Sequence, residues 1–230
     1  MKIITWNCRQ GGYRSKNKES IVLKLKPDIA VIPECENIGE QDSKNLWIGD
    51  NQKKGIGIFS YSNFKLKIHP QYNEDFKYIV PIEVTGPTNF ILIAIWSRPD
   101  DLGSGEINYI KTDLAALDFY KSLFKKNTII IGDLNWNKIW DSKNQKIFTE
   151  TVDFLKGKGI ESAYHKYFKE DFGEEQIKTL YHNNGNPYHI DYCFTSKSLK
   201  VLKVEIGKHI DWKKYSDHVP VIVNLDERKY

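Results

Sequence analysis

Residues 128–135 read Thr-Ile-Ile-Ile-Gly-Asp-Leu-Asn, a short apolar run that ends in the polar residues Asp133 and Asn135. An apolar run of this kind is typical of a strand buried on both faces. Asp133 and Asn135 lie at the end of this predicted strand, where side chains leave the packed core and meet at the edge of a sheet. They are therefore candidates for a functional site. The alternative is ordinary turn and helix-cap chemistry, because a helix is predicted nearby at 143–156.

Four other predicted strands carry polar residues at or beside one end. Asp191 is the most informative of these, because a carboxylate in an apolar strand is costly to bury without a partner. Each of the others, taken singly, is compatible with a turn. In chain order the strands and their polar residues are 2–6 with Asn7, 28–32 with Glu34, 190–195 with His189 and Asp191, and 219–225 with Ser216, Asp217 and His218.

The remaining pattern predicts an α+β protein with two largely antiparallel sheets flanked by helices. Turn signals at Ser62-Asn63 and at 86–89 leave short connections, which imply antiparallel neighbours. An amphipathic stripe predicts a helix over 106–125, and a shorter helix at 19–25 stops before Pro27. The other predicted strands are 55–61, 64–69, 78–84, 89–96, 179–182 and 199–206.

Composition limits the classes of protein that fit. The chain has 230 residues, of which 40% are hydrophobic and 13% aromatic, as in a folded protein, and we expect one domain over 1–230. Neither a signal peptide nor a membrane-spanning apolar run is recognisable, and Cys8, Cys35 and Cys193 suggest neither disulfides nor a zinc site. We therefore expect a cytoplasmic protein with no membrane partner and no obligate protein partner. A net charge of +4 is compatible with a polyanionic substrate without indicating one.

Taken together and in this order, the motifs resemble the endonuclease/exonuclease/phosphatase family, which includes DNase I and the exonuclease III-type abasic endonucleases. The resemblance covers residues 6–221 and keeps the approximate spacing of every motif. It implies a DNase I-like four-layer α/β/β/α sandwich, in which two mixed, largely antiparallel sheets pack face to face. It also implies hydrolysis of phosphodiester bonds with Mg²⁺ or Mn²⁺, most simply in DNA.

The resemblance assigns a metal-binding role to three residues. Glu34 is expected to hold the ion, because Mg²⁺ and Mn²⁺ prefer carboxylate oxygen. Asn7 and Asp217 are expected to help it. Glu36 matches no motif and is expected to be a solvated loop acid.

Four further residues are expected to carry the catalysis. His218 contacts the scissile phosphate or exchanges a proton, since imidazole serves in either state near neutral pH. The resemblance implies that Asp191 orients His218, that Asp133 orients or deprotonates the attacking water, and that Asn135 hydrogen-bonds the phosphate. The sequence leaves open which of these residues is the base.

One position departs from the family pattern. Trp96 ends a predicted strand where DNase I-like enzymes usually have histidine and abasic endonucleases have tyrosine. An indole N–H donates a hydrogen bond but does not transfer a proton near neutral pH. Arg98 is a candidate for the missing phosphate contact, and Arg9 resembles the DNase I side of the family.

Other substrate contacts are expected from the residues beside the motifs. His189 lies two positions before Asp191, so on one strand both side chains point the same way and His189 contacts phosphate. His182 is its neighbour or a loop residue. Trp136, Trp140 and Tyr188 form either an aromatic wall for a base or sugar, or a rim that seats a helix. The paired lysines Lys53-Lys54 and Lys213-Lys214 are expected to be ordinary surface.

Alternative functions remain open at this point. A phosphatase, or a phosphodiesterase acting on lipids or small molecules, uses the same scaffold, since fold and catalytic core do not fix the substrate. The segment 186–191 lacks the Cys-Asp-Arg signature expected of inositol phosphatases. A non-catalytic binding protein is disfavoured, because the departure at Trp96 is peripheral to metal binding and the other expected residues are present: Glu34, Asp133, Asn135, Asp191, Asp217 and His218.

Overall fold

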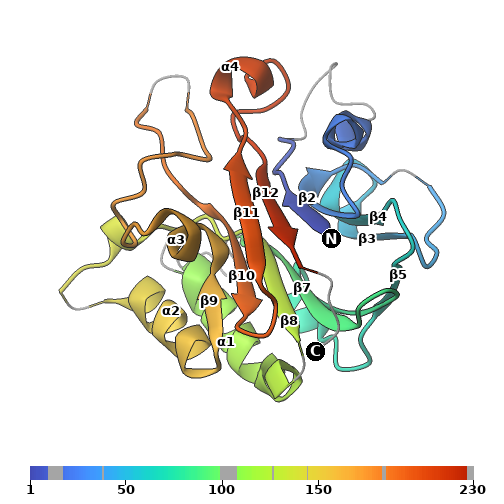
Figure 1. Ribbon diagram of the computed structural model, residues 1–230, viewed down its shortest axis with the longest axis horizontal. Coiled ribbons are helices and arrows are strands. Elements are labelled where there is room, and N and C mark those ends of the chain that lie inside the picture. The colour runs from blue at the N-terminus through green and yellow to red at the C-terminus, as the bar shows by residue number, and fades with distance from the viewer. Residues whose placement is uncertain are drawn as a thin grey trace.

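Two six-stranded sheets form the centre of the molecule in a computed structural model that describes residues 1–9, 18–37, 39–98, 108–125, 127–143, 145–182 and 185–226 (Figure 1). Only β1–β2 and β7–β8 are parallel pairs; the other pairs are antiparallel. The first sheet has the order β11 (Val201–Ile206), β12 (Val221–Leu225), β1 (Lys2–Thr5), β2 (Ile29–Cys35), β4 (Lys54–Ser60), β3 (Asn45–Asn51). The second has the order β5 (Lys65–Ile68), β6 (Ile79–Thr85), β7 (Phe90–Trp96), β8 (Thr128–Asp133), β10 (Asp191–Ser196), β9 (Ile160–Ser162).

The apolar strands have two buried faces, as their sequences predict. In β8, Ile129 and Ile131 point into the core between the sheets, whereas Ile130 packs on the helix side. The outer face of the second sheet is covered by α1 (Asn108–Phe119), the 3-10 helix η3 (Tyr120–Lys125) and α2 (Ile147–Gly157), and Figure 1 shows α1 beside α2.

The outer face of the first sheet is covered in the same way. Val22 of η1 (Lys18–Leu25) and Trp212 of α4 (His209–Trp212) pack there against Ala30 and Ile32 of β2. The four layers of the predicted α/β/β/α sandwich are therefore present. None of the helices in the described ranges is long and apolar enough to cross a membrane.

The predicted antiparallel pairing through Ser62-Asn63 is wrong. β4 belongs to the first sheet and β5 to the second, so the chain crosses between sheets at this turn. The reason is that β2 and β3 already occupy the two edges of β4. Lys44 holds the crossing by donating to the carbonyl oxygens of Ser62 and Phe64.

Several other elements also differ from prediction. Residues 179–182 form no strand, and only Leu180 bridges there, to Tyr188 and to His218. The helix predicted over 106–125 ends as the 3-10 helix η3, and its residues 106–107 lie outside the described ranges, as do most residues of the loop at 9–12. β3, β9, α3 (Ala163–Phe168), α4 and the short 3-10 helices η2 (Glu74–Phe76) and η4 (Lys138–Trp140) were not predicted.

Candidate active site

The polar residues at the strand ends converge on one edge of the sandwich. β1 and β2 are parallel, so Asn7 and Glu34 lie at the same edge, and the antiparallel β12 begins there just after His218. In the second sheet, Asp133 at the end of β8 lies opposite Asp191 at the start of β10. Both sheets therefore contribute side chains to one site.

A hydrogen bond joins the two sheets at this edge. Nδ1 of His218 lies 2.8 Å from Oδ2 of Asp191, and both side chains are buried. Burial alone would lower the pKa of His218, but the Asp191 carboxylate, with smaller effects from Asp133 and Asp217, raises it to about 10. The imidazole is therefore protonated at neutral pH. Within the described part of the chain, Oδ1 of Asp191 has no hydrogen-bond partner.

Asp133 is a second buried carboxyl group in contact range of this pair. Burial and the charge of Asp191 raise the pKa of Asp133 to about 7, against the opposing effect of His218. Nδ2 of Asn7 lies 2.8 Å from its Oδ2, and Nδ2 of Asn135 lies 3.1 Å from the same oxygen. A group with this pKa exchanges a proton near neutral pH.

The backbone after β8 is shaped to present these side chains. A Cβ at Gly132 would lie 1.8 Å from the carbonyl oxygen of Ile95, so only glycine allows this approach to β7. Asn135 adopts a left-handed conformation with φ 48°. Its amide nitrogen donates to Asp133 and, at 2.8 Å, to the carbonyl oxygen of Ser97, so in this arrangement it holds Asp133. The phosphate contact predicted for Asn135 stays a prediction.

Glu34 reaches the site through an irregularity in β2. The pairing with β4 shifts between Pro33 and Cys35, and Glu34 within this bulge has φ 58°. A non-glycine residue in this conformation is strained by about 1 kcal/mol, and such strain is often found at functional sites. The bulge directs Glu34 toward Asn7, whose Nδ2 lies 3.4 Å from Oε1 of Glu34.

The donor set around Glu34 fits a hard divalent cation. Glu34, Asn7 and Asp217 all line one cleft and offer the oxygen ligands that Mg²⁺ and Mn²⁺ prefer. Asn7 turns its amide nitrogen toward Glu34, while its oxygen accepts from the Arg9 N–H at 2.9 Å, so ligation by Asn7 requires the amide to turn over.

A second group of side chains also has metal-like spacing. Asp133, Asp191 and His218 each place one potential ligand atom within 4.8 Å of the others. A protonated His218 opposes a cation at that point, because two positive charges repel each other. Of the two groups, the one around Glu34 fits a metal better.

Two cationic side chains are paired with these acids. Arg9 lies 3.1 Å from Oδ2 of Asp217, and Nζ of Lys54 lies 3.0 Å from Oε2 of Glu34. Arg9 was predicted to be at the site, whereas Lys54 was assigned to ordinary surface. Lys54 could have been predicted at the site, because it lies at the start of a strand next to the strand that carries Glu34. It was overlooked because it is one of two consecutive lysines, which are usually exposed on the surface.

The cleft has a volume of about 430 Å³ and an aromatic wall. The rings of Trp140 and Tyr188 lie 4.8 Å apart, and His182 lies beside Tyr188. Trp136 stands behind them and packs against the helix-side core, so only Trp140 and Tyr188 of the predicted aromatic group face the cleft. The lining residues are Asn7, Arg9, Glu34, Lys54, Asn135, Trp140, Leu180, His182, Tyr188, Ile190, Asp217 and His218.

Two predicted substrate contacts lie elsewhere. His189 is buried outside the cleft, its Nδ1 lies 2.8 Å from the carbonyl oxygen of Ile177, and burial lowers its pKa to about 4. Because β10 begins only at Asp191, the alternation rule does not extend to His189, and its predicted direction stays a prediction. Arg98 lies over the rings of Tyr78 and Trp96 and lines a neighbouring hollow.

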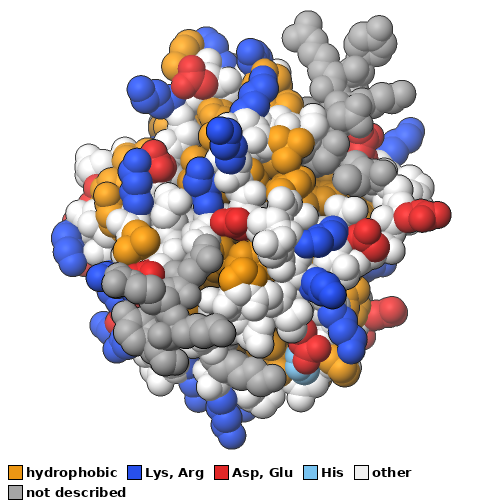
Figure 2. Space-filling view, turned by 45° about the vertical axis from the view of Figure 1, so that its right-hand side comes forward, with side chains coloured by type: hydrophobic (Ala, Val, Ile, Leu, Met, Phe, Trp, Pro, Cys, Tyr) orange, Lys and Arg blue, Asp and Glu red, His pale blue; other side chains and the backbone are white. Residues whose placement is uncertain are grey.

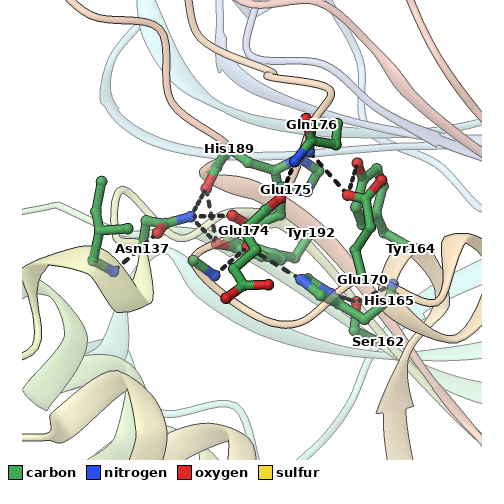
Figure 3. A network of polar contacts seen from close by, with 12 residues as sticks. Asn137, Ser162, Tyr164, His165, Glu170, Glu174, Glu175, Gln176, His189 and Tyr192 are labelled. Atoms are coloured by element: carbon green, nitrogen blue, oxygen red, sulfur yellow. Dashed lines mark hydrogen bonds and ion pairs between the residues drawn. The ribbon is translucent and has the colours of Figure 1, made fainter.

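A buried polar network, seen in Figure 3, supports the wall of the site from behind. Glu175 accepts hydrogen bonds from Asn137 and from the Gly173 N–H, and its Oε1 lies 3.1 Å from Nε2 of His165. Burial alone would raise the pKa of Glu175, but these bonds lower it to about 2. Asn137 also donates to the carbonyl oxygen of His189 at 2.8 Å, which connects the loop after β8 to the start of β10. Sequence reasoning did not find this network.

The charge on the molecular surface is dispersed. Figure 2 shows lysine and arginine side chains spread over one face, with acidic side chains among them. This distribution agrees with the small net charge of +4. On this face, the distribution of charge does not by itself indicate a nucleic-acid-binding surface.

Comparison with known proteins identifies the fold. No protein-family model matches the sequence, and no curated protein matches it. A structure of the 3' phosphatase NExo from Neisseria bound to a product DNA hairpin is similar, with a TM-score of 0.74 and 18% identity over 98% of this chain and 99% of that one. An AP endonuclease from Archaeoglobus fulgidus is similar with a TM-score of 0.70 and 16% identity over 98% and 99% of the two chains.

A third solved structure has a similar fold. An endonuclease/exonuclease/phosphatase protein from Beutenbergia cavernae has a TM-score of 0.61 and 13% identity over 97% of this chain and 70% of that chain. The predicted DNase I-like fold is therefore confirmed. At these identities the likeness concerns the fold, and the chemistry has to be argued from the cleft.

Proposed function

We propose that the protein is a divalent-metal-dependent phosphodiesterase whose substrate is DNA. The observation that carries the proposal is the 2.8 Å contact between His218 and Asp191, formed beside Asp133 and next to the cleft that holds Glu34. The resemblance to a DNA 3' phosphatase and an AP endonuclease supports nucleic acid over lipid or small-molecule substrates. Because the described part of the chain contains no disulfide, we place the enzyme in the reducing cytoplasm.

Hydrolysis of a phosphodiester requires charge compensation and a positioned water. Glu34 and Asp217, with Asn7 once its amide has turned over, would hold Mg²⁺ or Mn²⁺, which would offset the negative charge of the phosphoryl oxygens. The protonated His218 donates a hydrogen bond to a phosphate oxygen, and Asp191 holds its ring from behind. Asp133, with a pKa of about 7, accepts a proton from the attacking water.

Neighbouring residues position these groups and the substrate. Asn135 orients the Asp133 carboxylate, and Asn7 does so as long as its amide nitrogen faces Asp133. Trp140 and Tyr188 offer ring faces on which a base or sugar stacks, and His182 and Arg9 lie at the same cleft for contacts with the strand.

The test is a cleavage assay with Mg²⁺, Mn²⁺ or EDTA. The substrates are supercoiled plasmid, an abasic duplex, an oligonucleotide with a 3' phosphate and bis-p-nitrophenyl phosphate. His218→Ala is compared with His69→Ala, which changes a histidine next to β5, outside the cleft. We expect metal-dependent cleavage of DNA that falls by about 10³-fold or more in His218→Ala and is unchanged in His69→Ala.

The outcomes separate the alternatives. Release of inorganic phosphate from the 3'-phosphate substrate alone would replace the diesterase with a phosphatase. Cleavage of only the small diester would remove DNA as the substrate. Full activity in His218→Ala would overturn the catalytic scheme.

A further inference from the structure

Lys54 occupies an unusual position between the proposed metal ligand and Trp96. It is the first residue of β4, and its Nζ lies 3.0 Å from Oε2 of Glu34 and 5.3 Å from the centre of the Trp96 ring. The shift in β2–β4 pairing, which sets Cys35 opposite Gly55, places the bulged Glu34 next to Lys54. The contact is therefore built by the backbone of two adjacent strands.

The contact with Glu34 conflicts with the proposed binding of a metal. A divalent ion bound to a carboxylate lies about 2.0–2.6 Å from its oxygen, and a second cation beside the same oxygen is repelled. An ion that binds Oε2 therefore displaces the ammonium group from Glu34. Its side chain is 36% exposed, which leaves room for the movement, and it stays within the cleft.

A phosphate contact is missing at this place. Trp96 cannot supply one that also carries positive charge, Arg98 is stacked on Tyr78 and Trp96 beside another hollow, and His189 is buried outside the cleft. Among the described cleft residues, Arg9 is paired with Asp217, another proposed metal ligand, so the two cations hold different acids. A released lysine ammonium has three N–H donors and a full positive charge, which suit a phosphate oxygen.

We infer that Lys54 is a substrate-binding residue that is held by Glu34 in the metal-free protein and is released by the metal to contact a phosphate oxygen. The inference rests on the proposed phosphoester substrate and adds a coupling between metal and substrate binding. The ion thus prepares the cleft for an anion by freeing a cation, in addition to its own charge.

The experiment compares Lys54→Met with Lys53→Met, which removes the neighbouring, exposed lysine of the same turn. Calorimetric titration gives the affinity for Mn²⁺ and then, with Mn²⁺ saturating, for inorganic phosphate. Without its competitor Glu34 binds Mn²⁺ about 2- to 5-fold more tightly in Lys54→Met, as expected for a part-exposed ion pair. Phosphate affinity falls by about 10-fold or more, as expected for loss of a charge-assisted hydrogen bond. Lys53→Met changes neither.

Either of two results overturns the inference: Mn²⁺ affinity that is equal or weaker in Lys54→Met, or phosphate affinity that does not change. Lys54→Gln, with unfolding midpoints for all variants, guards against a folding defect. If both binding results hold but DNA is not cleaved, the proposed function fails and the role of Lys54 stands. If DNA is cleaved but Lys54→Met behaves as Lys53→Met, the function stands and the role of Lys54 fails.

Discussion

At the residue scale, the site concentrates three ionisable groups that are all buried: Asp133, Asp191 and His218. Two carboxyl groups at this distance repel each other when both are ionised, and a protonated imidazole between them offsets part of that repulsion. The arrangement keeps His218 charged and brings the pKa of Asp133 to about 7. At neutral pH, a protonated hydrogen-bond donor, His218, therefore lies beside a proton acceptor, Asp133.

This arrangement predicts how the stability of the metal-free protein depends on pH. His218 stays protonated in the folded state up to a pH of about 10, but in the unfolded chain only up to the ordinary histidine pKa of 6.5. Between these limits the folded state binds more protons, so its advantage is complete below pH 6.5 and is lost as pH rises toward 10. We expect the free energy of unfolding in EDTA to fall by on the order of 2 kcal/mol between pH 7 and 9.

Urea titrations at several pH values measure this change, with His218→Gln as the comparison. The variant lacks the imidazole, so its unfolding free energy should decline much less over the same range. Identical declines in both proteins would show that His218 has an ordinary pKa.

Which residues were predictable depended on their place in the strands. The convergence of His218, Asp191 and Asp133 was predictable, because motifs at strand ends meet at a sheet edge whatever the details of the fold. The alternation rule could not place His189, because it applies inside a strand and β10 starts two residues later. Lys54 was missed, because its role depends on a bulge in another strand that the sequence does not reveal.

At the element scale, α3 and the segment after it stabilise the start of β10. His165 of α3 contacts Glu175, and Glu175 in turn binds Asn137 from the loop after β8 (Figure 3). A buried carboxylate with these partners is destabilising when a partner is removed, because the remaining polar groups stay buried without compensation.

Replacement of Glu175 should therefore unfold the protein more easily. We expect Glu175→Ala to lower the unfolding free energy by about 3 kcal/mol at pH 7, whereas Glu174→Ala, at an exposed neighbour, changes it little. Because the pKa of Glu175 is lowered to about 2, its contribution to stability is present above the ordinary glutamate pKa of 4.5 and is lost as pH falls through 2. Urea unfolding at pH 7 and pH 3 tests both statements, and a constant difference would contradict the second.

Strands were predicted correctly where the apolar run was long. The prediction failed where the pairing of a strand depended on segments far away in the sequence. The runs that became β2, β7 and β8 were evident from composition alone. The turn at Ser62-Asn63 looked like a hairpin, but β4 has both edges occupied by β2 and β3. β9, with three residues, is too short for a periodic pattern.

At the scale of the whole molecule, the site bridges the two sheets. Asn7, Glu34 and His218 come from the first sheet, and Asp133 and Asp191 from the second. Asn7 donates a hydrogen bond to Asp133 and also lies beside Glu34. The positions of the side chains at the edge of one sheet therefore depend on those at the edge of the other. A ligand at Glu34 therefore stabilises the docked pair of sheets, since it binds only the folded state.

We expect Mn²⁺ to raise the melting temperature. At a concentration about 100 times the dissociation constant, the gain is about 2.7 kcal/mol, which corresponds to roughly 5–10 °C for a domain of this size. The shift should disappear in Glu34→Gln and with EDTA, and persist in Glu36→Gln, a nearby acid outside the cleft. Differential scanning calorimetry measures it, and an equal shift in Glu34→Gln would place the ion elsewhere.

The layered architecture was predictable because its physical causes are local. Strands with two apolar faces require cover on both sides, and an amphipathic helix supplies it. The order of strands within each sheet was not predictable from these patterns, because it depends on pairings between segments far apart in the chain.

The place of β12 in the first sheet has a consequence for synthesis on the ribosome. β12 lies between β11 and β1, next to the first strand of the described chain, as Figure 1 shows in red and blue. While a nascent chain lacks residues 216–225, one edge of β1 has no partner and His218 has not yet been made. The proposed nuclease then lacks the imidazole of His218. Hydrolytic activity therefore appears only after His218 has been synthesised and β12 has paired with β1.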